Sequence, residues 1–439
     1  MFDIGRLSNF IPIINQFMAF DRKRSLTFGD ALKSSRRTAF SSMIKPIGSL
    51  CNLDCSYCYY LDKAELYGRR QPKMNYELLE EFIRQYIEAN DIPVVTFGWH
   101  GGEPLLAGLD YYRKAVEFQQ KYKGDKKIDN NIQTNGTLLN REWCEFFREN
   151  NFLVGVSIDG PKDIHDAYRL DKGGKPTFDK IVENIEMMSL YGVEYNTLST
   201  VNKKCEGRGA EVYRFMKSIG SHYMQFLPVV EHIVDVPGSN RPVIVPPGHP
   251  GSRLAEWSVS PEGFGRFMCD VFDEWVMSDV GQYYVQLFDV ALAQWHGVPP
   301  SLCSFAETCG DALVVEHNGD VYSCDHYVYP EYKLGNIMQD DMLGMVRSKK
   351  QFKFGIDKRN SLPAECLKCK WYFACRGECP KHRFDIAANG EKNLNTLCRG
   401  YKLFFSHVDP YMKFMSDCLK RQQPPAMVMQ WARQRMGFM

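Results

Sequence analysis

Short apolar runs alternate with amphipathic stretches between residues 42 and 231. In Tyr76–Ala89 and Phe178–Tyr191 the apolar residues recur with the 3.6-residue period of a helix that buries one face. Strands that alternate with helices predict a parallel α/β unit, for which a partial barrel and an open sheet fit equally well. In either architecture the loops after the carboxyl ends of the strands carry the chemistry. The six predicted strands are Met43–Ile47, Val94–Trp99, Ile128–Thr134, Val154–Ile158, Thr197–Val201 and Tyr223–Val230.

The pattern changes in the second half of the chain. Residues 237–251 are dense in Pro and Gly and predict a connector, after which a helix is expected to begin near Ser260–Glu262. From Leu302 to Gly400, cysteines crowd among Gly, Pro and short β runs. This region has too little regular apolar pattern for an ordinary core, so metal centres are expected to hold it together. The tail after Tyr401 is predicted to be helical.

Composition adds one unusual feature. Of the 439 residues, 44% are hydrophobic and 24% charged, and 54 basic residues against 53 acidic give a net charge of +1. This balance disfavours nucleic acid or a membrane surface as a partner. The N-terminus lacks the basic leader of a secretory signal, and no apolar run is long enough to span a membrane, so we expect a cytoplasmic chain. The 15 cysteines, an odd number, therefore indicate metal or redox chemistry rather than disulfides.

Three of the cysteines form a C-x3-C-x2-C motif directly after the first predicted strand. Cys51, Cys55 and Cys58 are one thiolate short of the four that close a 4Fe–4S cluster, which would leave one iron free for an outside ligand. Zinc with a missing ligand is the competing interpretation, and a disulfide is a weaker one.

The motif, with the aromatic Tyr57 before its last cysteine, resembles the radical S-adenosylmethionine superfamily. The resemblance implies that the open iron chelates S-adenosylmethionine and that the cluster cleaves it to a 5′-deoxyadenosyl radical. It also implies that the HGGEP segment, with Gly101, Gly102 and Glu103, contacts the cofactor, with Gly102 at the methionyl amino group. On the residues alone, GGEP is equally well a tight turn.

Three further contacts follow from the same resemblance. Ser157, in SIDGP, and Arg169, in HDAYR, would hold the ribose and carboxylate ends of S-adenosylmethionine. Arg suits a carboxylate because its guanidinium donates two parallel hydrogen bonds. Val230, at the end of the sixth predicted strand, would pack against adenine. The alternatives from the residues alone are a surface ion pair for Arg169 and an ordinary core position for Val230.

Eight further cysteines are ordered in the C-terminal region, enough for two complete four-thiolate sites. Structural zinc sites are the alternative, because CxxC pairs are common in them. The run resembles the SPASM domain, which carries two auxiliary 4Fe–4S clusters. By family pattern the ligands of the first auxiliary cluster are Cys303, Cys309, Cys324 and Cys379, and those of the second are Cys366, Cys369, Cys375 and Cys398. Of the remaining cysteines, Cys144 and Cys269 are expected to be small buried apolar residues.

The sequence is identified more narrowly by four segments: KPIGSLCNLDCSYCYYL, HGGEP, GECPKHRF and GDVYSCDHYVYPEYKLGN, the last of which is Gly319–Asn336. All four resemble anaerobic sulfatase-maturating enzymes, which convert an active-site Cys or Ser of a sulfatase into Cα-formylglycine. The resemblance makes Asp325, next to Cys324, the general base that deprotonates the target side chain. On the residues alone, Asp325 is also consistent with a solvated turn carboxylate.

The resemblance implies a partial (β/α)6 TIM-like barrel followed by a SPASM domain with two auxiliary iron–sulfur clusters. The expected divisions are an N-terminal extension (1–40), the radical S-adenosylmethionine barrel (41–235), a connector with a helical segment (236–300), the SPASM domain (301–400) and a helical tail (401–439). The extension is longer than the short leader that is usual in the family.

The implied cofactors are three 4Fe–4S clusters and S-adenosylmethionine. The implied partners are an unfolded sulfatase polypeptide with a C/S-x-P/A-x-R motif and an electron donor such as flavodoxin or ferredoxin. One alternative is a SPASM-type enzyme that crosslinks or epimerises another ribosomal peptide, although 40 residues are too few for the winged-helix recognition domain such enzymes often carry. A non-enzymatic iron–sulfur carrier or zinc scaffold is a second alternative, against which the intact HGGEP segment argues.

Overall fold

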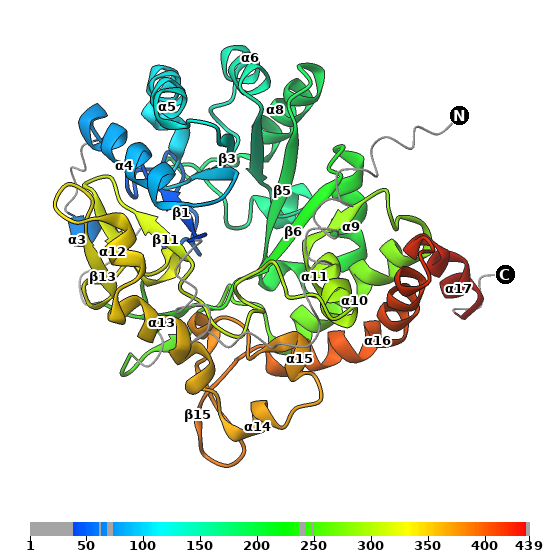
Figure 1. Cartoon of the computed structure of the whole chain (residues 1–439). Coiled ribbons are helices and arrows are strands. Elements are labelled where there is room, and N and C mark those ends of the chain that lie inside the picture. Colours follow the sequence, from blue (N-terminus) through cyan, green and yellow to red (C-terminus); the bar gives the residue numbers. More distant parts are fainter. Residues whose placement is uncertain (1–37, 61–62, 68–72, 237–241, 247–248, 436–439) are drawn as a thin grey trace.

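The computed structural model describes residues 38–60, 63–67, 73–236, 242–246 and 249–435. Nearly all of the predicted extension 1–40, and part of the predicted connector 237–251, lie outside the described residues. In Figure 1 the helices α4, α5, α6 and α8 lie in a row along the outer side of the strands, and the cysteine-rich segment continues from the same sheet.

Ten strands form one sheet in the order β10-β6-β5-β4-β3-β2-β1-β11-β12-β13. Strands β1 to β6 pair in parallel with their neighbours in sequence. Because this order never reverses, right-handed crossovers place every connecting helix on one side, which gives a partial barrel and not a doubly wound sheet. The strands are β1 (Ser41–Ile44), β2 (Val94–Trp99), β3 (Lys127–Thr134), β4 (Phe152–Ser157), β5 (Tyr195–Val201), β6 (Tyr223–Pro228) and β10 (Tyr284–Val285).

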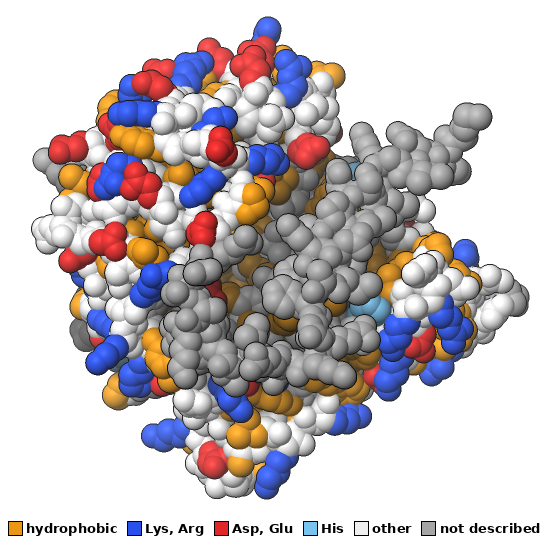
Figure 2. Space-filling model, in the orientation of Figure 1, with side chains coloured by type: hydrophobic (Ala, Val, Ile, Leu, Met, Phe, Trp, Pro, Cys, Tyr) orange, Lys and Arg blue, Asp and Glu red, His pale blue; other side chains and the backbone are white. Residues whose placement is uncertain are grey.

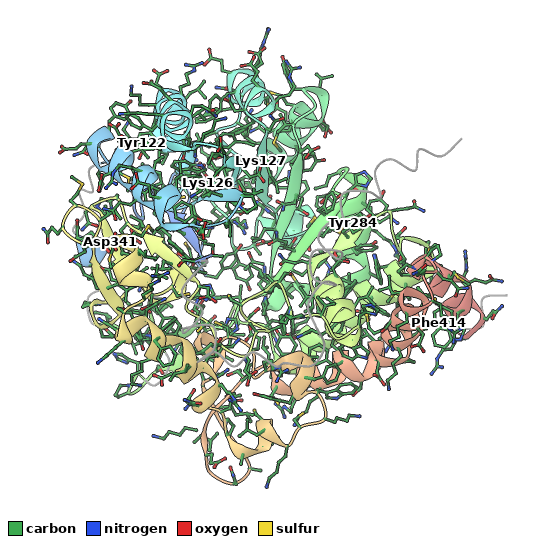
Figure 3. The ribbon with its side chains drawn as sticks, in the orientation of Figure 1. Tyr122, Lys126, Lys127, Tyr284, Asp341 and Phe414 are labelled. Atoms are coloured by element: carbon green, nitrogen blue, oxygen red, sulfur yellow. The ribbon has the colours of Figure 1, made fainter. Side chains whose placement is uncertain are left out.

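The predicted helix Tyr76–Ala89 is confirmed as α4 with the same bounds. It begins at Asn75, whose side chain accepts a hydrogen bond from Leu78 N at 2.8 Å. Near its end, Lys126 Nζ donates to the carbonyls of Ile87 and Asn90, and Figure 3 shows Lys126 beside Lys127 at the start of β3. The other helices of the barrel are α3 (Ala64–Tyr67), α5 (Leu109–Tyr122), α6 (Arg141–Glu149), α7 (Lys162–His165), α8 (Phe178–Leu190) and α9 (Gly209–Ser218).

The six predicted strands are present, but two of them end two or three residues earlier than expected. The strand β1 stops at Ile44 and not at Ile47, because Pro46 has no N–H to donate and the chain turns so that Gly48 N bonds Lys45 O at 3.2 Å. The strand β6 stops at Pro228 and not at Val230. Both corrections move residues from the sheet into the loops at its carboxyl edge, where the chemistry is expected.

The predicted connector contains more structure than a linker. The strand β8 (Val243–Val245) lies within it and pairs antiparallel with β7 (His232–Val234), which also pairs with β9 (Arg253–Leu254). The described part of 237–251 therefore contains a short strand within the predicted connector. Its Val-Ile-Val run supplies the short edge strand.

The cysteine-rich region extends the barrel sheet. The strand β11 (Ala312–Val315) pairs in parallel with β1, and β12 (Asp320–Tyr322) and β13 (Lys333–Asn336) follow as antiparallel strands. Apolar residues of this region, including Leu313, Val321 and Trp371, belong to the same buried cluster as the barrel core. The expectation that this region lacks an ordinary core was wrong, because it borrows the core of the neighbouring sheet.

The remaining elements are mostly helical, as expected for the tail. Ser260 caps α10 (Pro261–Ser278), which packs against α16 (Cys398–Lys420) where Gly265 and Gly400 allow close approach. None of the described helices is both long and apolar enough to cross a membrane. The other elements are α11 (Gln286–Trp295), α12 (Met342–Val346), α13 (Lys349–Asn360), α14 (Ala364–Leu367), α15 (Tyr372–Cys375), β14 (Asp385–Ile386), β15 (Lys392–Leu394) and α17 (Val428–Arg435).

Candidate active site

The three cysteines of the C-x3-C-x2-C motif lie together in the loop after β1. Cys58 N donates to Cys55 O at 3.0 Å, and the Cys51 thiol accepts from Leu53 N at 3.4 Å. The pKa of Cys51 is raised to about 11 and that of Cys55 to about 12, mainly by burial; Cys58 contributes to the rise at both thiols, and Cys51 contributes at Cys55. The structure therefore places three thiols within electrostatic reach of one another at the carboxyl edge of the sheet.

The HGGEP segment, after β2, docks directly on this cysteine loop. Gly102 N donates to Gly48 O at 2.8 Å, and Glu103 N donates to Leu50 O at 2.9 Å. A Cβ atom on Gly102 would lie 2.0 Å from Leu50 O, which only glycine avoids. Gly101 has φ near +140°, a conformation that side chains rarely adopt. The glycines are thus required for the close approach of the two loops.

Glu103 joins HGGEP to the QTNG segment that follows β3. Its fully buried carboxylate accepts hydrogen bonds from Thr134 Oγ1 at 2.8 Å, Leu105 N at 3.0 Å and Asn135 N at 2.7 Å. Burial raises the pKa of Glu103 to about 7. In the structure the Glu103 side chain therefore contacts protein groups and fixes the relative position of the two loops.

Arg169 and Tyr57 meet at Asp159, a buried residue that the sequence analysis did not single out. Arg169 Nε lies 3.0 Å from Asp159 Oδ1, Tyr57 donates to Asp159 Oδ2, and Arg169 Nη2 donates to Thr200 Oγ1 at 2.8 Å. This ion pair ties the cysteine loop to the ends of β4 and β5. The signal that could have found Asp159 is its place within SIDGP, immediately after a predicted strand.

Ser157 and Val230 lie at the same edge of the sheet. Ser157 Oγ accepts a hydrogen bond from Gln133 Nε2 at 3.0 Å, which links the ends of β4 and β3. Val230 is fully buried just beyond β6, and its neighbour Val229 donates to Val201 O at 2.9 Å. The structure thus brings the predicted cofactor contacts to one edge, contributed by the loops of β1, β2, β4 and β6.

Asp325 lies between the cysteine loop and Cys324. One carboxylate oxygen is paired with Lys45 Nζ, and the other accepts from Tyr59 OH. Burial favours the neutral acid, but the Lys45 ammonium, His100 and His326 together outweigh it and hold the pKa of Asp325 well below its usual range. Asp325 is therefore a largely buried, ionised carboxylate and not a solvated turn residue.

Lys45 is a residue that the sequence analysis missed. Its side chain is fully buried, and its ammonium lies 3.2 Å from the centre of the Tyr60 ring, whose hydroxyl donates to Glu316. A lysine at the carboxyl end of a buried strand is the signal that could have identified it. The sequence analysis also missed Lys381, whose ammonium lies 4.0 Å from the centre of the Tyr59 ring and 2.6 Å from Glu231 Oε1.

His100, the first residue of HGGEP, faces the same carboxylate. Burial lowers the pKa of His100 to about 4, so the ring is neutral at neutral pH. Its buried Nδ1 has no hydrogen-bond partner among the described residues. A buried polar atom of this kind is available to a ligand bound beside Asp325.

The eight C-terminal cysteines separate into two groups in space. Cys303, Cys309, Cys324 and Cys379, the first auxiliary group, affect one another electrostatically: Cys303 raises the pKa of the other three thiols, beyond the larger effect of burial. Cys366, Cys369, Cys375 and Cys398, the second auxiliary group, line one cavity together with Trp371 and Tyr401. The two groups contain the same cysteines as the two sets implied by the family pattern.

This arrangement fits iron–sulfur clusters. The second group presents four free thiols around one cavity, and the first presents four free thiols, three of which lie within electrostatic reach of Cys303. Four thiolates are the donor set of a 4Fe–4S cluster. Within the described ranges, no three Cys, His, Asp or Glu side chains converge closely enough to hold a single metal ion. Cys144, Cys205, Cys269 and Cys418 are buried free thiols, which confirms the expectation for Cys144 and Cys269.

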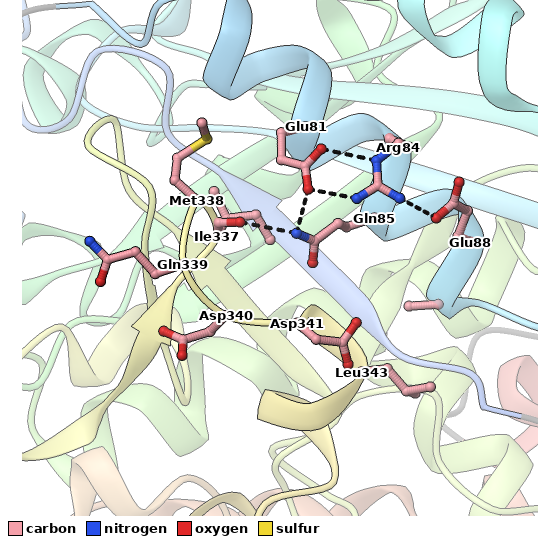
Figure 4. Close-up of a pocket in the computed structure, with 11 residues that line it drawn as sticks. Glu81, Arg84, Gln85, Glu88, Ile337, Met338, Gln339, Asp340, Asp341 and Leu343 are labelled. Carbon is pink, nitrogen blue, oxygen red and sulfur yellow. Dashed lines mark hydrogen bonds and ion pairs between the residues drawn. The ribbon is translucent and has the colours of Figure 1, made fainter.

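A separate pocket of about 410 Å³ lies between α4 and the turn after β13. Figure 4 shows Arg84 between Glu81 and Glu88 on its α4 side, and Gln85 bonded to the carbonyl of Ile337. None of the predicted site residues lines this pocket. It marks the junction between the barrel and the cysteine-rich region.

The comparisons with known proteins assign the class. Residues 46–203 match the radical SAM superfamily, where SAM denotes S-adenosylmethionine, and residues 303–370 match an iron–sulfur cluster-binding domain, SPASM. The sheet, the open three-cysteine loop and the two four-cysteine groups are thus those of a radical SAM enzyme with a C-terminal SPASM domain.

Relatives narrow the assignment. The chain is 52% identical over 389 residues to a serine-type anaerobic sulfatase-maturating enzyme of Bacteroides thetaiotaomicron, covering 88% of this chain and 94% of that protein. It is 36% identical over 392 residues to a cysteine-type enzyme of Clostridium novyi, covering 88% and 99%. The chain belongs to the family of anaerobic sulfatase-maturating enzymes.

Solved structures agree with this assignment. Native anSMEcpe with bound AdoMet and Cp18Cys peptide matches with a TM-score of 0.75 and 32% identity, over 87% of this chain and 99% of that one. Streptococcus suis SuiB bound to precursor peptide SuiA matches with a TM-score of 0.58 at 14% identity, which shows only that the fold is shared.

Proposed function

We propose that this chain oxidises a Ser or Cys side chain of an unfolded sulfatase polypeptide to Cα-formylglycine. The observation that carries the proposal is the position of Asp325, which adjoins Cys324 in sequence and contacts Tyr59, the residue after Cys58. The ionised Asp325 carboxylate thereby lies between the three-cysteine loop, where the reaction is expected to start, and the first auxiliary group, which is expected to receive the electron. The 52% identity to a serine-type relative supports the same function.

The cofactors follow from the donor sets. Cys51, Cys55 and Cys58 would hold the open 4Fe–4S cluster, and the two auxiliary groups would each hold a closed one. Tyr57, Gly101, Gly102, Glu103, Ser157, Arg169 and Val230 would surround S-adenosylmethionine. When bound, the open cluster and S-adenosylmethionine supply a 5′-deoxyadenosyl radical, which removes a hydrogen atom from the target Cβ.

Residues of this chain would position the target residue and accept its proton. The Asp325 carboxylate would accept the proton of the target hydroxyl or thiol, and it is charged before the reaction because Lys45 stabilises its ionised form. Tyr59 fixes the orientation of the carboxylate through its second oxygen. The His100 Nδ1 atom, which has no hydrogen-bond partner among the described residues, would bond the target or its backbone.

The substrate is proposed to be an extended segment with a C/S-x-P/A-x-R motif. An unfolded segment can donate and accept backbone hydrogen bonds along its length, and its Arg supplies a charged anchor. Because a serine-type enzyme is a 52% identical relative, we propose that Ser is accepted at least as well as Cys. We place the reaction in the cytoplasm, before the sulfatase folds.

The function is tested with reconstituted full-length protein, reductant, S-adenosylmethionine and a peptide that carries the motif. Mass spectrometry is expected to detect an aldehyde at the target residue in the Ser and Cys peptides. A matched peptide with Ala at that position serves as the control, because it has no side-chain hydroxyl or thiol. A thioether crosslink or an epimerised residue in place of the aldehyde would assign the chain to the peptide-crosslinking or epimerising class.

We further propose that an acidic electron carrier such as flavodoxin or ferredoxin docks beside the second auxiliary group. Exposed Lys368 and Lys370 flank Cys369, and Leu367 and Phe373 expose apolar surface next to them. The lower end of the molecule, around α14 and β15, carries several Lys and Arg side chains in Figure 2. Basic and apolar residues beside a redox group suit a weak complex with an acidic partner.

Charge reversal tests this docking proposal. The K368E/K370E variant is expected to associate with flavodoxin at least about tenfold more slowly at low ionic strength, because electrostatic steering is lost. Stopped-flow reduction of the reconstituted protein measures the rate. The control is K172E/K175E, which reverses two exposed lysines on the barrel. Equal rates for the two variants would contradict the proposed docking site.

A further inference from the structure

Helix α13 carries no cysteine, yet it contacts the backbone around the first auxiliary group. Gln351 Nε2 donates to Gly310 O at 2.7 Å and to Ser323 O at 3.2 Å, which fixes the residues next to Cys309 and Cys324. Gly355 O accepts from Cys309 N at 3.2 Å, and a Cβ on Gly355 would lie 2.3 Å from Cys309 O. The spacing of residues 351, 355 and 358 places them on one face of the helix.

Lys358 completes this face. Its buried Nζ donates to the carbonyls of Cys303 at 2.5 Å and Ser304 at 2.9 Å, and also to that of Ala306. Three donated hydrogen bonds need three N–H groups, so the side chain is an ammonium and not a neutral amine. Burial lowers the pKa of Lys358, and the neighbouring Cys309, Cys379 and Cys303 offset only part of this effect.

The fourth cysteine segment is attached to the same helix from the other side. Arg383 Nη1 donates to Lys358 O at 2.6 Å, while its Nη2 donates to Glu378 O at 2.9 Å, next to Cys379. All four segments of the first auxiliary group are therefore fixed to α13 directly or through Arg383. Lys358 is the buried cationic side chain that α13 contributes beside this group of cysteines.

The geometry points to Lys358 as a positioning residue that holds the Cys303 segment and, through its charge, raises the reduction potential of the cluster in the first auxiliary group. Reduction adds one negative charge to the cluster, and a fixed cation in a poorly solvated site stabilises that state. A higher reduction potential favours transfer of an electron to this cluster from the target residue after its Cβ hydrogen atom has been removed. The inference rests on the proposed function only in taking this cluster as present.

The test is an EPR-monitored redox titration of full-length protein in the C51A/C55A/C58A background, which removes the ligands of the open cluster. K358M and K358Q are expected to keep about eight irons. In each variant, one of the two midpoint potentials is expected to fall by at least 59 mV. This change corresponds to a tenfold shift of the one-electron equilibrium toward the oxidised cluster. K353M, which removes an exposed lysine of the same helix, is the matched control and is expected to leave both midpoints unchanged.

Each outcome decides the inference. An unchanged midpoint in K358M or K358Q with full iron content would overturn it. If both variants lose four irons, K358R, which keeps the charge, is expected to retain the cluster near the original midpoint, and loss of iron from K358R as well would overturn the role of the charge. If the parent protein itself binds only about four irons, the cluster assignment of the proposed function fails instead.

Discussion

Replacing Asp325 with Asn is expected to lower aldehyde formation by about 100- to 10,000-fold, the usual contribution of a general base, while 5′-deoxyadenosine continues to form. The amide of Asn has the shape of the carboxylate but cannot take a proton from the target. Formation of 5′-deoxyadenosine is expected to persist because Asp325 contacts Lys45 and Tyr59 and none of the predicted S-adenosylmethionine contacts. Peptide mass spectrometry and chromatography of the nucleoside measure the two products in one reaction.

A control is needed because D325N also leaves the buried Lys45 ammonium without its counter-charge, which by itself destabilises a fold. The double variant K45M/D325N removes both charges. It is expected to recover the stability and iron content of the original protein and to remain unable to form the aldehyde. Aldehyde formation by D325N at the original rate would remove Asp325 as the base.

Replacing Gly102 with Ala is expected to lower the rate of 5′-deoxyadenosine formation by about 100-fold, the effect of displacing a reacting group by roughly 1 Å. The new Cβ would lie 2.0 Å from Leu50 O, so either HGGEP or the cysteine loop must move. Both loops are predicted to contact the cofactor, and Glu103, the next residue, also anchors QTNG. The measurement is the rate of 5′-deoxyadenosine release at saturating S-adenosylmethionine, together with the iron content.

The matched control is G98A, which lies in β2 two residues before His100. A Cβ on Gly98 meets its nearest neighbour, Asn131 Oδ1, at an ordinary 3.4 Å, so this variant is expected to react like the original protein. A G102A variant with normal cofactor affinity and a normal rate would contradict the close packing of the two loops as a requirement for activity.

The regular elements and the cysteine groups could be predicted from the sequence because each leaves a local pattern. Tyr76–Ala89 shows its buried face in its own spacing, and the C-x3-C-x2-C motif is confined to eight residues. The choice between a barrel and an open sheet could not be made from periodicity, which does not determine strand order; the partial barrel was predicted only through the family resemblance.

The surroundings of Asp325 could not be predicted for a different reason. Tyr59 and Asp325 are separated by 266 positions, and the pairing of β1 with β11 helps to bring their loops together. The role of α13 was hidden because its contacts with the cysteine segments are made by Gln351, Gly355 and Lys358, which form no apolar stripe. The shared core was missed because the cysteine-rich region packs on apolar residues of the barrel and not on a pattern of its own.

The most direct test of the proposed function uses a motif peptide whose target Ser carries deuterium on Cβ. The 5′-deoxyadenosine formed with this peptide is expected to contain deuterium, and the same peptide is expected to gain an aldehyde in proportion to the nucleoside released. Nucleoside without deuterium, together with an unmodified Ser, would contradict the claim that this chain oxidises the target residue of a sulfatase.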